Sequence, residues 1–150
     1  MPDYTGMPSA VYTVPALASV GMTEEEANKV GLKFAAKSND MSSWCSARTY
    51  VETAAFAKVL VEDDTGNILG ADMVGHSAEE VIHRFAFAIK HGVTAQEIGG
   101  SVYAYPTFTS DLKYLVLRKY NHQPLASGAC FRCNSAITNW CYHYRGYRGP

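Results

Sequence analysis

Residues 68–94 constrain the fold most, because they combine a strand pattern, a glycine turn and the longest amphipathic helix pattern in the chain. Residues 68–74 are apolar or β-branched, interrupted by small or acidic residues, which is typical of a half-buried strand. Gly75 predicts a bend, and Ser77 with Glu80 has the spacing of a capping box that begins a helix. The apolar stripe of this helix contains Ala78, Val81, Ile82, Phe85, Ala88 and Ile89. Such a stripe is wide enough to cover a sheet.

Phe87 lies on the opposite side of the predicted helix, among His83, Arg84 and His91. A single aromatic residue on a solvent-exposed face is common, and this is one interpretation. The other is that the second face contacts a partner chain, because aromatic residues and arginine are enriched at interfaces.

The remaining pattern predicts short strands followed by helices. Thr23 with Glu26 and Thr94 with Glu97 form two further capping boxes. In chain order we expect a strand at 8–15, a loop to 21, a helix from the Thr23 cap to 30, a strand at 33–38 and a loop at 39–46. We then expect a strand within 49–62, a hairpin turn at 63–67, the strand and helix described above, a short helix after 94 and a last helix from about 110. This order predicts an α+β fold with an antiparallel sheet of about four to five strands, covered by helices on one face.

The distribution of charge divides the chain into two parts. Residues 1–117 hold all 14 acidic residues but 8 of the 13 basic ones, so they carry a net charge of −6 and the remainder carries +5. We therefore expect a domain at 1–117 and a basic Cys- and Tyr-rich tail at 118–150. The acidic balance argues against nucleic-acid binding by the domain. No signal peptide or membrane span is recognisable, so we expect a cytoplasmic protein.

The cysteines allow one alternative function. Four of them do not make a disulfide scaffold at this length, and Cys45 alone is expected to be inert. Within the tail, a zinc or thiol site could use Cys130, Cys133, Cys141 and His143. Because the tail has no acidic residue and little periodicity, the interpretation without a metal site is favoured.

The sequence GADMVGHS at 70–77 is one residue away from a phosphate-binding loop. Such a loop needs flexible residues between its glycines and a lysine, whereas here a strand pattern intervenes and His76 replaces the lysine. We expect instead that both glycines, Gly70 and Gly75, serve backbone turns. The three-glycine dinucleotide fingerprint and the serine nucleophile elbow are also missing from the sequence.

Tyr103 to Thr107, with the sequence YAYPT, is the most informative turn. The Tyr105–Pro106 bond is a candidate cis peptide, because an X–Pro bond has only a small preference for trans. Tyr105 would then project from a rigid corner. The alternative is a core tyrosine whose hydroxyl is satisfied locally.

With these motifs in place, residues 8 to about 116 resemble the C-terminal dimerisation domain of the FAD-dependent pyridine nucleotide-disulfide oxidoreductases, the group of glutathione reductase, dihydrolipoamide dehydrogenase and mercuric reductase. Three motifs carry the resemblance in the family's order. They are PSAVYTVPALASVGMTEEEA at 8–27, AFAKVLVEDDTGNILGADMVGHSAEEVIHRFAFAIKHGVT at 55–94, and YPTFTSD at 105–111.

The resemblance implies a domain that joins two subunits and places a His-Pro corner at the flavin and redox disulfide of the partner. In that family the histidine, oriented by a glutamate five residues on, protonates the leaving thiol. Tyr105 stands at the histidine position, Ser110 stands at the glutamate position, and Asp111 lies one place too late. Tyr105 is thus the candidate catalytic residue, and Tyr105 with Pro106 would contact the partner's flavin.

The change from imidazole to phenol weakens the corner as a base. A phenol pKa near 10 against about 6.5 for imidazole corresponds to roughly 5 kcal/mol at neutral pH. Tyr105 could still donate a hydrogen bond to a thiolate or line a substrate pocket. Mercuric reductases resemble this case in having a tyrosine at the corner, but their C-terminal cysteines are adjacent and those of this chain are not.

The sequence therefore predicts the dimerisation domain of a flavoprotein disulfide oxidoreductase acting in cell redox homeostasis. We expect a homodimer that binds no cofactor by itself and is inactive alone, because FAD and NAD(P) would be held by upstream domains of the parent enzyme. A metal- or thiol-binding module using the tail cysteines is the alternative. A free-standing enzyme acting through Tyr105 is a third possibility.

Overall fold

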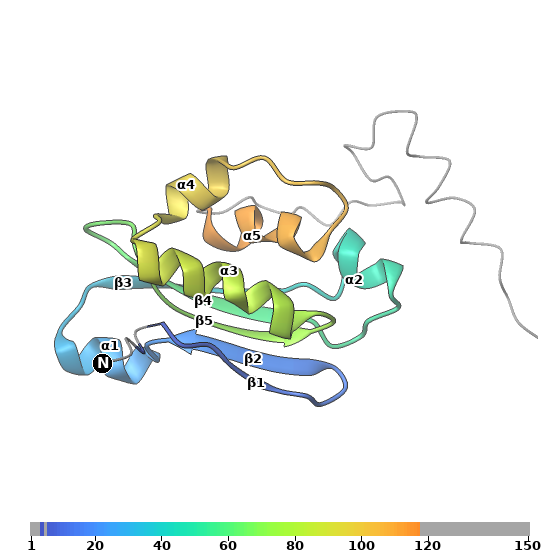
Figure 1. Ribbon diagram of the computed structural model, residues 1–150, viewed down its shortest axis with the longest axis horizontal. Helices are drawn as coiled ribbons and strands as arrows, with labels where there is room; N and C mark the ends of the chain where they lie inside the picture. The colour runs from blue at the N-terminus through green and yellow to red at the C-terminus, as the bar shows by residue number, and fades with distance from the viewer. Residues whose placement is uncertain (1–3, 5, 118–150) are drawn as a thin grey trace, which may run out of the picture. The chain divides into compact units, whose positions relative to one another are not determined.

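The structure, a computed structural model, describes Tyr4 and residues 6–117 of the chain. These residues form a five-stranded antiparallel sheet in the order β1-β2-β5-β4-β3 (Figure 1). The strands are β1 (Ser9–Val11), β2 (Ala16–Gly21), β3 (Phe34–Asp40), β4 (Phe56–Glu62) and β5 (Ile68–Gly75). The helices are α1 (Glu24–Val30), α2 (Cys45–Thr49), α3 (Ala78–His91), α4 (Ala95–Gly100) and α5 (Phe108–Val116). The predicted α+β class is confirmed.

The core lies between one face of the sheet and two helices. Helix α3 packs against β2 and β5, and α5 packs against β3 and β4 on the same face (Figure 1). Register explains which strand residues enter the core, since Ala18, Met73 and Ala57 are paired across β2, β5 and β4 and all three are buried. The predicted stripe of α3 is buried from Ala78 to Ala88, as expected for an amphipathic helix over a sheet.

Local signals predicted two of the helix starts correctly. Thr23 caps α1 and Thr94 caps α4, each in a complete capping box. The hairpin turn between β4 and β5 is also present, with Gly66 at a φ of 75°. Both features depend only on neighbouring residues.

The predicted capping box at Ser77 is wrong. Ser77 is in the left-handed region, with a φ of 59°, and its side chain accepts no capping hydrogen bond from the described residues. Its backbone carbonyl instead accepts hydrogen bonds from the N–H groups of Glu80 and Val81. The tight turn after Gly75 therefore changes the geometry on which the box depends.

Two segments predicted as loops have regular structure. The segment after residue 15 forms β2, and the predicted strand at 8–15 is only β1 with the turn that follows it. β2 is stabilised by pairing with β5 along its whole length. Within the predicted 39–46 loop, β3 extends to Asp40. Helix α2 begins at Cys45, and its N-cap residue Trp44 makes no side-chain capping hydrogen bond to the described part of the chain.

Candidate functional site

The predicted corner connects α4 to α5. Its Tyr105–Pro106 peptide is cis. Thr107 is the N-cap of α5: its hydroxyl accepts a hydrogen bond from the Ser110 N–H at 3.1 Å and donates one to the Ala104 carbonyl at 2.8 Å. α5 therefore begins at Phe108, two residues before the predicted start, and these hydrogen bonds fix the corner to its first turn.

Tyr105 is not a core residue, because 38% of it is exposed. The local hydrogen bond expected for the hydroxyl of a core tyrosine is found at Tyr103 instead. Tyr103 is half-buried and packs against the core, and its hydroxyl donates a hydrogen bond to the Ile98 carbonyl at 2.9 Å. Within the YAYPT turn, one tyrosine thus anchors the chain and the other reaches the surface.

The two residues near the glutamate position have other partners. Ser110 is buried, and its hydroxyl donates a hydrogen bond to the Thr107 carbonyl at 2.6 Å. Asp111 is 7% exposed, and its Oδ2 accepts a hydrogen bond from the Ser46 hydroxyl of α2. Asp111 therefore ties α5 to α2 and does not replace the glutamate.

Burial raises the pKa of Asp111 to about 6, although the hydrogen bond from Ser46 and the charge of Lys113 act in the opposite direction. This pKa lies above the ordinary value of 3.8. The carboxyl group therefore makes its full contribution to the stability of the fold below pH 3.8, and this contribution is lost as the pH rises through 6. The difference in unfolding free energy between Asp111→Asn and the unsubstituted chain should therefore grow by about 2 kcal/mol, in favour of the variant, as the pH rises from about 4 to 7.5.

Urea unfolding at a series of pH values measures this difference. Comparing the two proteins at each pH removes the contribution of groups that both share, including Glu26 and Glu97, whose pKa values are lowered by their capping hydrogen bonds. A difference that stays constant with pH would mean that Asp111 does not titrate in this range.

An aromatic cluster that the sequence did not reveal lies next to the corner. The rings of Tyr50 and His76 stack with centroids 4.2 Å apart, and Phe108 lies 5.3 Å from His76 and 5.4 Å from Tyr50. Val51, which follows Tyr50, has a φ of 56°. A β-branched residue in this region is an outlier. No local motif could predict the cluster, because its members come from three separate segments.

The phosphate-loop alternative has no structural support. The residues between Gly70 and Gly75 are part of β5, so no loop is present there to surround a phosphate. Gly75 has a φ of 149° and serves the bend, as expected. The expectation for Gly70 is wrong: it lies inside the strand, where an added Cβ would be 2.1 Å from the Met22 carbonyl oxygen. This glycine permits close backbone approach.

The predicted tail ligands, Cys130, Cys133, Cys141 and His143, lie outside the described residues. Within the described part of the chain, no three His, Cys, Asp or Glu side chains are grouped as a metal site. Every helix in that part is too short or too polar to cross a lipid bilayer.

Comparisons with known proteins identify relatives of this domain. A 19.7 kDa protein described as uncharacterised and encoded in a mercuric resistance operon of Staphylococcus aureus is 40% identical over 114 residues, which are 76% of this chain and 63% of that protein. Dihydrolipoyl dehydrogenase of Bacillus subtilis is 36% identical over 70% of this chain and 22% of its own length. Mercuric reductase of Shewanella putrefaciens is 32% identical over 74% of this chain and 20% of its own length.

The fold matches the same group of proteins. The HOCl-induced flavoprotein disulfide reductase RclA from Escherichia coli superimposes with a TM-score of 0.72 at 24% identity, covering 75% of this chain and 26% of that one. The chain thus spans about a quarter or less of the full-length reductases. These comparisons give no support to the alternative of a metal- or thiol-binding module. The sequence model described as "Pyridine nucleotide-disulphide oxidoreductase, dimerisation domain" matches residues 7–116, so the chain belongs to this dimerisation-domain family.

Proposed function

We propose that this chain forms a homodimer and presents its Tyr105–Pro106 corner to the flavin and redox disulfide of a disulfide reductase. The family match over residues 7–116 carries the proposal, because it covers nearly all of the described domain. FAD and NAD(P) would be bound by the rest of the parent protein, and the chain alone would be inactive. The domain boundary at 117 and a cytoplasmic location are part of this proposal.

The open face of the sheet supports contact with further domains. Register aligns Val11, Leu17, Val74 and Phe56 in one row across β1, β2, β5 and β4. These residues lie on the face opposite the core, and Val11, Leu17 and Phe56 are 57%, 48% and 42% exposed. An apolar row of this kind is typical of a surface that another domain covers. It suits the FAD- and NAD(P)-binding parts that make up most of the full-length relatives.

Tyr105 would act in this assembly as a hydrogen-bond donor rather than as a base. A phenol keeps its proton at neutral pH, so it can stabilise a thiolate but cannot readily accept a proton. Its exposure at the fixed corner supports this role. Ser110 stands at the position where the family has the glutamate that orients its histidine.

A metal ion is a second candidate substrate of the parent reductase. The observation that favours it is the 40% identical relative from a mercuric resistance operon, together with the similarity to a mercuric reductase. The tyrosine at the corner is consistent with this chemistry. Disulfide and Hg²⁺ substrates therefore both belong in any assay of the assembled reductase.

Sedimentation of the full chain at micromolar concentration tests the proposal, and a dimer is the expected result. A monomer at all accessible concentrations would contradict it.

With the FAD- and NAD(P)-binding parts present, Tyr105→Phe should slow reduction of the disulfide or of Hg²⁺ and leave reduction of the flavin by NAD(P)H unchanged. If Tyr105→Phe and the unsubstituted protein reduce the disulfide or Hg²⁺ at equal rates, Tyr105 takes no part in that step.

A further inference from the structure

Helix α2 lies beside α5, the helix that begins directly after the Tyr105–Pro106 corner (Figure 1). Three side-chain contacts join the two helices. In order along the chain from the N-cap to the C-cap of α2, they are Trp44 with Tyr114, Ser46 with Asp111, and Tyr50 with Phe108. The residue number falls along α5 as it rises along α2, so the two helices run antiparallel.

The two contacts nearest the corner come from one face of each helix. Ser46 and Tyr50 are four residues apart, and such residues lie next to each other on a helix surface. Phe108 and Asp111 are three apart, which has the same effect. The Ser46 hydroxyl donates its hydrogen bond to Asp111 in a buried position, and the ring centroids of Tyr50 and Phe108 are 5.4 Å apart. α2 thus contacts the first turn of α5 at two points.

The position of α2 is not determined by its own sequence. It has only five residues, and Trp44 makes no side-chain capping hydrogen bond to the described part of the chain. A helix this short is unstable by itself. At its end the N–H groups of Val51 and Glu52 donate to the carbonyls of Arg48 and Ala47, but Val51 has a φ of 56° where glycine is usual. The contacts with α5 therefore hold α2 in place despite this strain.

The corner follows the orientation of the first turn of α5. Thr107 fixes the two together, because its hydroxyl bonds to that turn and to the Ala104 carbonyl on the other side of the corner. We infer that Ser46 of α2 and its C-cap residue Tyr50 are positioning residues for Tyr105. They hold the first turn of α5, and through it the corner, in the orientation in which the phenol reaches the substrate. This inference rests on the proposed function and adds to it two residues that act through α5 rather than on the substrate.

NMR and amide hydrogen exchange of the full chain measure this coupling. Tyr50→Ala should shift the ring signals of Tyr105 and raise the exchange rate of the Ser110 N–H, which donates to the capping hydroxyl, about fivefold. The Tyr105 signals are assigned by their loss in Tyr105→Phe. Ser46→Ala removes the second contact and should have the same effects. Exchange of the β4 amides should change by less than about twofold, because the loss is local.

Two conservative variants keep the contacts and should leave both readouts at their original values. Tyr50→Phe retains the stacked ring. Asp111→Asn retains a side-chain oxygen that accepts the hydrogen bond from Ser46. If the conservative variants behave like the truncations, the two contacts do not explain the effect and the inference is wrong.

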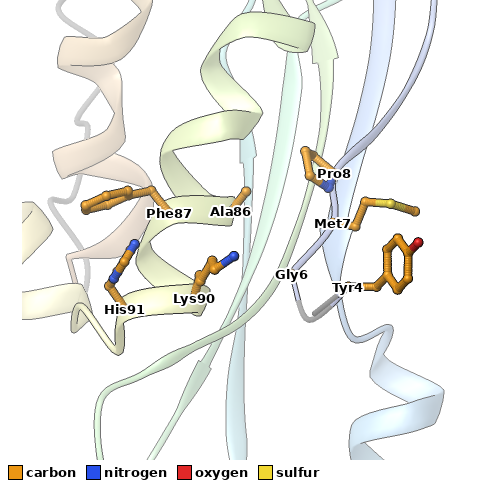
Figure 2. Close-up of a pocket in the computed structure, with 8 residues that line it drawn as sticks. All are labelled: Tyr4, Gly6, Met7, Pro8, Ala86, Phe87, Lys90 and His91. Atoms are coloured by element: carbon orange, nitrogen blue, oxygen red, sulfur yellow. The ribbon is translucent and has the colours of Figure 1, made fainter. Parts of the chain in front are cut away.

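Phe87→Ala is the matched control for Tyr50→Ala, because the two rings are 60% and 58% exposed. Each ring also lies against a histidine. The centroid of Phe87 is 4.3 Å from that of His91, and the centroid of Tyr50 is 4.2 Å from that of His76. Phe87 borders a groove of about 330 Å³ between α3 and the N-terminal segment, and none of the described residues that line this groove belongs to α2, α5 or the corner (Figure 2). Its truncation should leave both readouts unchanged.

Reduction kinetics connect the positioning to the proposed function. With the FAD- and NAD(P)-binding parts present, Tyr50→Ala should slow reduction of the disulfide or of Hg²⁺ about tenfold, because a displaced phenol contributes less to this step. Tyr50→Phe should not slow it, and reduction of the flavin by NAD(P)H should be the same in both variants. If Tyr105→Phe slows the substrate step and Tyr50→Ala does not, the inference is wrong.

The outcomes separate this inference from the proposed function. If Tyr50→Ala changes neither the Tyr105 signals nor the exchange of Ser110, α2 does not position the corner, and the proposed role of Tyr105 stands. If exchange rises equally at Ser110 and in β4, the variant lowers the stability of the whole domain and the inference is wrong. If Tyr105→Phe leaves the substrate step unchanged while Tyr50→Ala shifts the Tyr105 signals, the proposed role of Tyr105 is wrong and its positioning by α2 holds.

Discussion

Replacing Phe85 with alanine should lower the free energy of unfolding by about 3–5 kcal/mol. Phe85 is 0% exposed and is the largest fully buried side chain among the described residues. It belongs to the core cluster formed between the sheet and the helices, on the buried stripe of α3. Truncation would remove its burial and leave a cavity that neighbours on a regular helix and sheet cannot readily fill.

Phe87→Ala is the matched control, because it makes the same truncation two residues further along the same helix. Phe87 is 60% exposed, so its loss should cost less than about 1 kcal/mol of monomer stability. Guanidinium unfolding followed by circular dichroism measures both variants. Since dimerisation adds to apparent stability, the comparison is made at several protein concentrations and extrapolated to the monomer. Equal losses for the two variants would contradict the assignment of the buried face.

The parts of the fold that the sequence predicts well depend on local patterns. The buried stripe of α3 follows from its helical period, and the caps at Thr23 and Thr94 follow from residue pairs three positions apart. The predicted box at Ser77 has the same spacing, but the chain enters the helix through a left-handed residue. The spacing of the two residues alone does not indicate the direction from which the backbone enters the helix.

The missed elements depend on contacts between distant residues. β2 has the sequence ALASVG, whose small residues have little strand preference, and it forms because β5 and β1 pair with it on both sides. Helix α2 is tied to α5 through Ser46 and Asp111, which are 65 residues apart. Neither contact leaves a signal in the neighbouring sequence.

The candidate site shows the same division. The corner at Tyr105–Pro106 could be predicted because a turn motif lies in consecutive residues. The stacked rings of Tyr50, His76 and Phe108 beside it could not, because the fold brings them together from the end of α2, the β5–α3 turn and the start of α5.

Gly70→Ala should destabilise the domain by about 3 kcal/mol, because the new methyl group would meet backbone rather than a movable side chain. The added Cβ would be 2.1 Å from the carbonyl oxygen of Met22 and 3.0 Å from its nitrogen. That nitrogen donates a hydrogen bond to the Leu69 carbonyl at 2.9 Å, and Gly21 pairs with Gly70 at the same place. The strands could separate only by losing pairing between β2 and β5.

Gly100→Ala provides the control for this prediction. Gly100 ends α4, and within the described part of the chain a Cβ added there would have no atom within 4 Å. Its substitution should change the unfolding free energy by no more than about 0.5 kcal/mol, and alanine could even stabilise the helix. Denaturant midpoints of the two variants test whether the close approach of Gly70 to Met22 limits this position to glycine. If Gly70→Ala is as stable as the unsubstituted chain, the close approach to Met22 does not constrain this position. In that case the strand explanation for the glycine in GADMVGHS is wrong.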